Sequence, residues 1–105
     1  MNSISPKDLK ELLDKGQDIQ IIDVREEFEF EACNIGGKLI PMGEVINKTE
    51  EIRKDGMVVV HCKAGTRSKA IINLLETQFK YENLYNLDGG IFKWIDEVDD
   101  SLTKY

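Results

Sequence analysis

The sequence predicts an α/β domain with a central, mostly parallel sheet of five strands flanked by helices. Short apolar segments of strand length alternate along the chain with segments whose apolar residues recur at helical spacing. Residues 57–60 are four consecutive apolar residues, three of them valines, as expected for a strand buried on both faces of a parallel sheet. With 105 residues and 41% hydrophobic content, the chain suits one domain and is too short for two, so residues 1–105 are predicted to be a single domain.

The first strand and helix are marked by residues near the amino end. Ile4 begins a short strand. Ser5 then precedes Pro6, a common helix opening in which a hydroxyl caps the helix and proline takes its first position. The leucines that follow repeat at helical spacing and form one apolar stripe, and Gly16 ends the helix.

The second strand, residues 19–24, is followed closely by a cation. Asp23 and Arg25 could act near a catalytic site, because the carboxyl ends of parallel strands meet at one edge of the sheet. They could instead form a structural ion pair that fixes neighbouring loops. Buried charges usually occur in pairs, so we favour the structural pair.

Residues 26–31 are predicted to be a short helical turn in which carboxylates surround two phenylalanines. Such a cluster could bind a metal or serve acid–base chemistry, but no histidine or clustered aspartate accompanies it. Carboxylates this dense usually form a solvated face. We therefore predict a solvated face made by Glu26, Glu27, Glu29 and Glu31.

The remaining elements continue the alternation of strand and helix. The predicted order is a turn and short strand over 35–41, a helix over 42–52, a turn at 54–56, the central strand from 57, a long helix over 69–79, the last strand at 84–87, a turn at 88–90 and a final helix over 91–98. Trp94 in the final helix is predicted to be a core residue.

The central strand leads to Cys62 at the carboxyl edge of the sheet, where open α/β sheets bind ligands. A turn containing Lys63 and Arg67 follows, and then a helix begins. The helix start presents unpaired N–H groups and about half a positive charge to this turn. A cysteine in such a place can have its pKa lowered from about 8.5 to roughly 3.5–7.5. Cys62 is therefore predicted to be a nucleophilic thiolate.

The Cys62 loop (residues 62–67) resembles the active-site loop of the rhodanese (sulfurtransferase) family. Residues 23–26 resemble the first signature of that family, residues 35–41 its following strand, and residues 87–91 with Trp94 its C-terminal signature. The resemblance covers nearly the whole chain in the family's order. It implies a rhodanese-like three-layer sandwich and a single-domain rhodanese.

The sequence departs from the family pattern before Ile35, where Cys33 and Asn34 replace the usual glycine and histidine. Cys33 could be a resolving thiol that attacks oxidised Cys62, or a small residue that fills a glycine position, and we favour the second interpretation. His61 is the only histidine. On the central strand it is expected to be a hydrogen-bonded core residue, because thiolate attack on sulfur needs no general base.

The length of the Cys62 loop distinguishes two enzyme classes. Cysteine phosphatases place five residues between cysteine and arginine, whereas only four separate Cys62 from Arg67. The shorter loop brings its N–H groups closer to the sulfur, which crowds a phosphate-sized oxyanion and leaves room for one additional sulfur atom. Rhodaneses with sulfurtransferase activity have this six-residue loop, and their relatives with a longer loop act on phosphate or arsenate.

The predicted reaction is thiosulfate sulfurtransfer by a ping-pong mechanism. Cys62 takes sulfane sulfur from thiosulfate or a persulfide donor, and the resulting persulfide passes it to cyanide or a thiol. The predicted substrate-binding residues are Lys63, Ala64, Gly65, Thr66, Arg67 and Ser68. Lys63 and Arg67 would hold the donor's oxygens, Gly65 would allow close backbone approach, and the two hydroxyls would donate or cap the helix. Each also has a structural alternative: solvation for the lysine, capping for the hydroxyls and the turn itself for the glycine.

Composition restricts the partners and the compartment. A net charge of −6 argues against nucleic acid or an anionic membrane as a partner. Two cysteines, no signal segment and no apolar run of membrane length favour a reducing, cytoplasmic setting. We expect no metal or other cofactor, a thiol acceptor such as glutathione or thioredoxin, and a monomer or weak dimer. The alternative to an enzyme is a non-catalytic rhodanese-like module for binding or for sulfur carriage.

Overall fold

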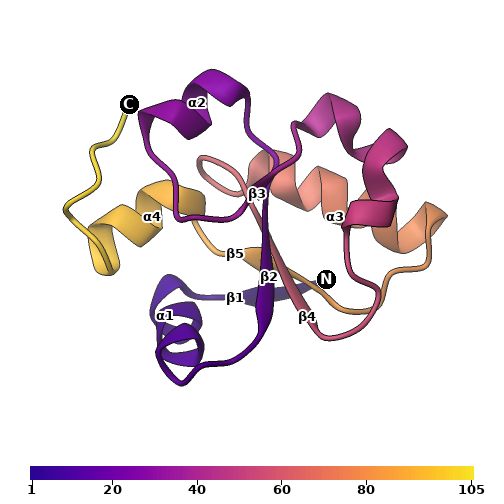
Figure 1. Cartoon of the computed structure of the whole chain (residues 1–105), viewed down its shortest axis with the longest axis horizontal. Coiled ribbons are helices and arrows are strands. Elements are labelled where there is room, and N and C mark those ends of the chain that lie inside the picture. The colour runs from indigo at the N-terminus through magenta and orange to yellow at the C-terminus, as the bar shows by residue number, and fades with distance from the viewer.

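The computed structural model describes residues 1–105 and contains one sheet of five parallel strands in the order β1-β5-β4-β2-β3 (Figure 1). This confirms the predicted fold class. The elements are β1 (Asn2–Ile4), α1 (Pro6–Asp14), β2 (Ile19–Asp23), α2 (Glu27–Ala32), β3 (Lys38–Leu39), the 3₁₀ segment η1 (Met42–Glu51), β4 (Met57–His61), α3 (Thr66–Gln78), β5 (Leu84–Leu87) and α4 (Gly90–Glu97).

Helices cover both faces of the sheet. α3 and η1 pack on one face and α1 and α4 on the other, as Figure 1 shows. The alternation of side chains along β4 divides the core accordingly. Val58 and Val60 join the cluster under α3, and Val59 joins the cluster with Leu9 and Trp94. Trp94 is thus a core residue, as predicted.

Two helical segments differ from the sequence prediction. α3 begins at Thr66, three residues before the predicted start, because Gly65 adopts a left-handed conformation (φ 107°) and turns the chain directly into the helix. The segment predicted as a helix over 42–52 is a 3₁₀ segment with a kink at Lys48. None of the helices is both long enough and apolar enough to cross a membrane.

Candidate active site

The sulfur of Cys62 faces the first turn of α3 from the carboxyl end of β4. Its Sγ accepts hydrogen bonds from the backbone N–H of Gly65 at 3.1 Å and of Ser68 at 3.4 Å. The Ser68 hydroxyl lies 3.5 Å from the same sulfur. Because α3 begins at Thr66, the Ser68 amide is one of the unpaired donors of a helix start.

These donors favour the ionised form of Cys62. Burial of the sulfur opposes ionisation, but the hydrogen bonds from Ser68 and from the loop amides outweigh it and lower the pKa of the Cys62 thiol. The residue is 1% exposed, so only a small reactant group can reach the sulfur. The arrangement suits a nucleophilic thiolate that receives one further atom.

The N-terminus of α4 holds the Cys62 loop in place. The amide of Ile91 donates to the carbonyl of Cys62 at 2.9 Å, and the amide of Phe92 donates to that of Lys63 at 3.1 Å. Gly90 has φ +62°, and a Cβ added there would lie 2.4 Å from the Lys63 oxygen and 2.6 Å from the Cys62 oxygen. The close approach of loop and helix therefore requires glycine at position 90.

The two cations of the loop have different environments. The Nζ of Lys63 lies 5.0 Å from the ring centroid of Phe92 and 5.3 Å from that of Tyr105, and it forms no ion pair. Arg67 instead donates through both terminal nitrogens to the carboxylate of Glu29, at 2.7 and 2.9 Å. Lys63 is the loop cation whose charge is not neutralised by a carboxylate.

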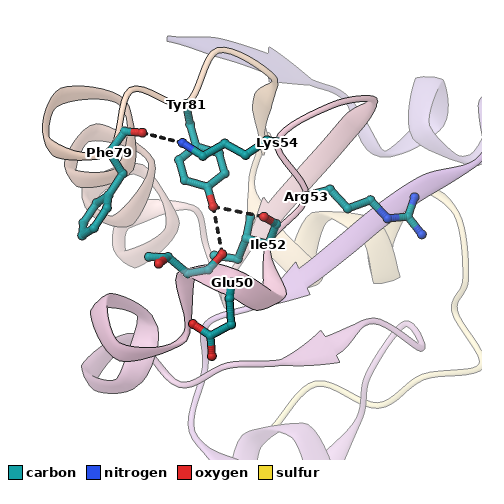
Figure 2. Close-up of a pocket in the computed structure, with 7 residues that line it drawn as sticks. Glu50, Ile52, Arg53, Lys54, Phe79 and Tyr81 are labelled. Carbon is teal, nitrogen blue, oxygen red and sulfur yellow. Dashed lines mark hydrogen bonds between the residues drawn. The ribbon is translucent and has the colours of Figure 1, made fainter.

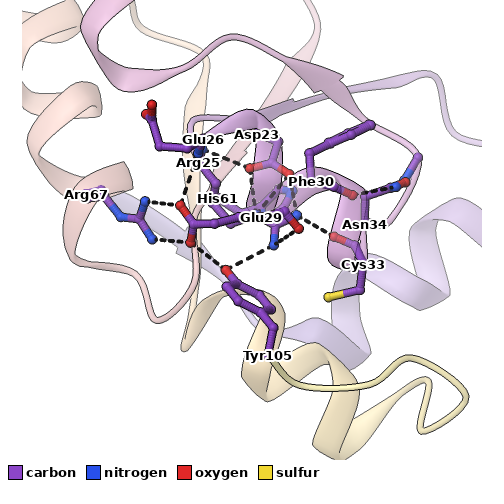
Figure 3. Close-up of polar contacts among 11 residues, drawn as sticks. Asp23, Arg25, Glu26, Glu29, Phe30, Cys33, Asn34, His61, Arg67 and Tyr105 are labelled. Atoms are coloured by element: carbon purple, nitrogen blue, oxygen red, sulfur yellow. Dashed lines mark hydrogen bonds and ion pairs between the residues drawn. The ribbon is translucent and has the colours of Figure 1, made fainter.

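Glu29 is buried, so its predicted place on a solvated face is wrong. Its carboxylate accepts from Arg67, from the Tyr105 hydroxyl at 2.6 Å and from the Glu26 amide at 3.1 Å (Figure 3). The bond from Arg67 is the main cause that lowers the pKa of Glu29 to about 2, against the opposing effect of burial. Glu26, Glu27 and Glu31 are exposed, as predicted.

Asp23 and Arg25 form the buried structural ion pair that the sequence favoured. The Arg25 guanidinium donates to both Asp23 carboxylate oxygens, and both side chains are almost completely buried. Arg25 also donates to the backbone carbonyls of Glu29 and Cys33, so it holds the C-terminal turn of α2. His61 is buried as predicted, but neither ring nitrogen has a hydrogen-bond partner. Its burial lowers the pKa of the imidazole, which disfavours the protonated form.

Comparison with known proteins identifies this arrangement. The model of the rhodanese-like domain matches residues 5–97. The chain belongs to the rhodanese-like domain family. A rhodanese-like domain protein from Staphylococcus aureus is 31% identical with a TM-score of 0.83, and the match covers 93% of this chain and 95% of that one.

Sequence relatives carry the rhodanese domain within larger proteins. A probable adenylyltransferase/sulfurtransferase MoeZ of Mycobacterium tuberculosis is 31% identical over 99% of this chain and 27% of its own length. A tRNA uridine(34) hydroxylase of Acinetobacter baumannii is 31% identical over 94% of this chain and 34% of its own length. The chain thus spans only about a quarter to a third of these two relatives.

The other predicted loop residues of the rhodanese domain differ in their exposure and in their contacts. Ala64 and Thr66 are exposed, and Gly65, which has no capping side chain, is the N-cap of α3. Ser68 is buried, and its hydroxyl donates to the Gly65 carbonyl at 3.1 Å. Cys33 is buried in an apolar cluster with Ile91 and Ile95, which supports its interpretation as a small packing residue.

Sequence reasoning missed three residues close to the loop. Asn86 and Tyr105 were not considered, and Glu29 was placed on the surface. Asn86 had a detectable signal, because a polar residue inside the apolar last strand implies a buried partner. Tyr105 lies outside every predicted element and offered no such signal.

The largest pocket of the rhodanese domain is remote from Cys62. It encloses about 380 Å³ at the C-terminal end of α3, between Lys54, Phe79 and Tyr81 (Figure 2). Lys54 donates to the Phe79 carbonyl, and its Nζ lies 3.8 Å from the ring centroid of Tyr81. No cysteine or histidine lines it, and Cys62 lies at the other end of α3.

Proposed function

We propose that this rhodanese domain is a sulfurtransferase in which Cys62 carries the transferred sulfur as a persulfide. The observation that supports this most directly is the pair of backbone amides, of Gly65 and Ser68, that donate to the Cys62 sulfur. They stabilise a thiolate before the reaction and a persulfide anion after it. Membership in the rhodanese-like family and the similarity to a probable sulfurtransferase agree with this chemistry.

The first half of the proposed reaction loads sulfur onto Cys62. The thiolate attacks the outer sulfur of thiosulfate, a new S–S bond forms, and the bond to the sulfonate sulfur breaks. Sulfite leaves with the electron pair of that bond. A persulfide donor would react in the same way and release its thiolate. No metal or other cofactor takes part in this step.

The second half discharges the persulfide. An acceptor thiolate attacks the terminal sulfur, takes it as a new persulfide and returns Cys62 to a thiolate; cyanide would take it as thiocyanate. The two half-reactions share one sulfur site, so the kinetics are ping-pong. We propose thiols such as glutathione or thioredoxin as acceptors and a cytoplasmic setting, in which such thiols remain reduced.

Lys63 and Arg67 are proposed to bind the donor's sulfonate. Lys63 has no carboxylate partner and can approach an anion directly. Arg67 uses two of its five N–H donors on Glu29, which leaves the others for a ligand. Glu29 thus fixes the orientation of the guanidinium at the edge of the loop.

The test of this function is the mass of the protein after incubation with thiosulfate. We expect one added sulfur atom on Cys62, its release by cyanide or a thiol, and no addition in Cys62→Ser. Cys33→Ser is the matched control and should load normally. Absence of the added sulfur in the unaltered protein would contradict the proposal.

Two alternatives give different results in the same assays. A sulfur-carrier module would load but discharge only to a particular protein, so a panel of small thiols and thioredoxin separates it from an enzyme. A phosphatase or arsenate reductase would turn over a phosphate ester or arsenate. We expect no such turnover, because four residues between Cys62 and Arg67 make the loop too narrow.

A further inference from the structure

Asn86 lies beside the Cys62 loop and makes a hydrogen bond with the side chain of Ser68, the residue that follows the loop. It pairs with Val60 in the sheet, faces α3 and is 1% exposed. Its Oδ1 accepts a hydrogen bond of 2.5 Å from the Ser68 hydroxyl. The Ser68 hydroxyl is in turn 3.5 Å from the Cys62 sulfur. A buried chain of polar atoms therefore runs from Asn86 through Ser68 to the reactive sulfur.

The Ser68 hydroxyl has more acceptors around it than it has protons. It lies close to the Gly65 carbonyl at 3.1 Å, to Asn86 Oδ1 and to the Cys62 sulfur. A hydroxyl donates one proton. While two oxygens compete for that proton, a thiolate at Cys62 receives little of it. This orientation of the amide suits the protonated thiol, which can donate its own S–H to the Ser68 oxygen.

The other half of the Asn86 carboxamide has no partner. Its Nδ2 is buried and makes no hydrogen bond. A buried amide N–H₂ without an acceptor destabilises the folded protein. Rotating the carboxamide by half a turn would direct Nδ2 at the Ser68 oxygen. Ser68 would then accept from Asn86 and be free to donate its proton to the sulfur.

We propose that Asn86 is a positioning residue that directs the Ser68 hydroxyl proton to the Cys62 sulfur by donating its amide N–H to the Ser68 oxygen. The structure shows Asn86 accepting from Ser68, and the proposal assigns this arrangement to Cys62 as a thiol. When the thiol proton has left to water, the carboxamide turns over and Ser68 becomes the third donor to the thiolate. The inference rests on the proposed function only in taking Cys62 as the nucleophile.

The experiment measures the pKa of Cys62 from the pH dependence of its alkylation by iodoacetamide. It uses the full chain with Cys33→Ser, so that one thiol reacts. Asn86→Leu removes the amide at nearly constant side-chain volume. We expect the pKa of Cys62 to rise by about one unit, which is a roughly tenfold loss of thiolate at any pH below that pKa. Ser68→Ala should raise the pKa at least as much. Asn86→Leu added to Ser68→Ala should change nothing further.

The controls separate this role from a structural one. Asn73→Leu makes the same change on the exposed face of α3 and should leave the thiol pKa unchanged. If Asn86→Leu does not fold, as judged by circular dichroism, Asn86→Ala replaces it. The proposal would be overturned if Asn86→Leu lowered the pKa of Cys62 or left it unchanged. It would also be overturned if Asn86→Leu raised that pKa as much in a Ser68→Ala protein as it does in the protein that keeps Ser68.

The outcome is independent of sulfur transfer, because alkylation needs no sulfur donor. If thiosulfate fails to load the unaltered protein while the alkylation series behaves as expected, the proposed function fails and the role of Asn86 stands. If loading succeeds and the alkylation series shows no effect of Asn86, the role of Asn86 fails and the proposed function stands.

Discussion

Glu29 binds Arg67, a residue 38 positions away in the sequence, and this contact determines the environment of its carboxylate. Its neighbours Glu27 and Glu31 are exposed on the same short helix. Counting carboxylates in a segment cannot identify the one that faces a cation brought in by the fold. The prediction of exposure from the charge pattern was correct for three of the four glutamates and wrong for Glu29, the one near the site.

Replacing Glu29 by glutamine tests the energy of this contact. Glu29→Gln leaves Arg67 partly buried without its carboxylate, so we expect the free energy of unfolding to fall by about 2 kcal/mol. Urea unfolding at neutral pH measures it. Glu31→Gln is the matched control on the same helix, and we expect it to change the free energy by less than about 0.5 kcal/mol. Equal effects of the two changes would contradict the contact.

The contribution of Glu29 should also depend on pH. Its pKa is lowered from 4.5 to about 2 in the folded protein, so the unfolded chain binds the proton first as the pH falls. The stabilisation is therefore fully present above about pH 4.5 and is lost progressively towards pH 2. The difference in unfolding free energy between Glu29→Gln and the unaltered protein should shrink over this range. A difference that stays constant from pH 6 to pH 3 would contradict the assignment.

At the scale of elements, the order and type of most segments followed from the sequence. Runs such as residues 57–60 are apolar throughout and can be placed only in the middle of a parallel sheet. The start of α3 could not be placed, because it depends on the left-handed conformation of Gly65. That boundary matters chemically, since it makes the Ser68 amide a free donor for Cys62.

The contact between α4 and the Cys62 loop gives a further prediction. Gly90→Ala would place a methyl group 2.4 Å from the Lys63 carbonyl oxygen, so loop or helix must move. We expect a loss of about 2–3 kcal/mol in unfolding free energy and slower alkylation of Cys62.

Gly16→Ala is the matched control for this change. Gly16 also has a positive φ of 81°, but nothing lies within 4 Å of a Cβ added there. Gly16→Ala should therefore show the effect of backbone strain alone, a loss of about 1 kcal/mol in unfolding free energy, with no change in the rate of Cys62 alkylation. If Cys62 is alkylated equally fast in the two variants, the close contact at position 90 does not position the loop.

At the scale of the whole molecule, one polar cluster joins distant parts of the chain. Arg25 follows β2, Glu29 lies in α2, Arg67 lies in the first turn of α3, and Tyr105 lies beyond α4 (Figure 3). The Asp23–Arg25 pair could be predicted from buried charges in neighbouring positions. The link to Tyr105 could not, because it is 76 residues from Glu29 and no periodic pattern leads to it.

Tyr105 should be coupled energetically to Glu29. The Tyr105 hydroxyl donates to Glu29 and accepts from Arg25 at 3.1 Å, so Tyr105→Phe removes one hydrogen bond from each. We expect a loss of about 1–2 kcal/mol in unfolding free energy. Because both changes remove the same contact, Tyr105→Phe and Glu29→Gln together should cost less than the two separate losses, by at least about 0.5 kcal/mol. Tyr85 is the control, because its hydroxyl makes no hydrogen bond within the chain. The losses of unfolding free energy from Tyr85→Phe and Glu29→Gln should therefore add. Additivity for both tyrosines would show that the segment carrying Tyr105 does not support the cluster beside the reactive loop.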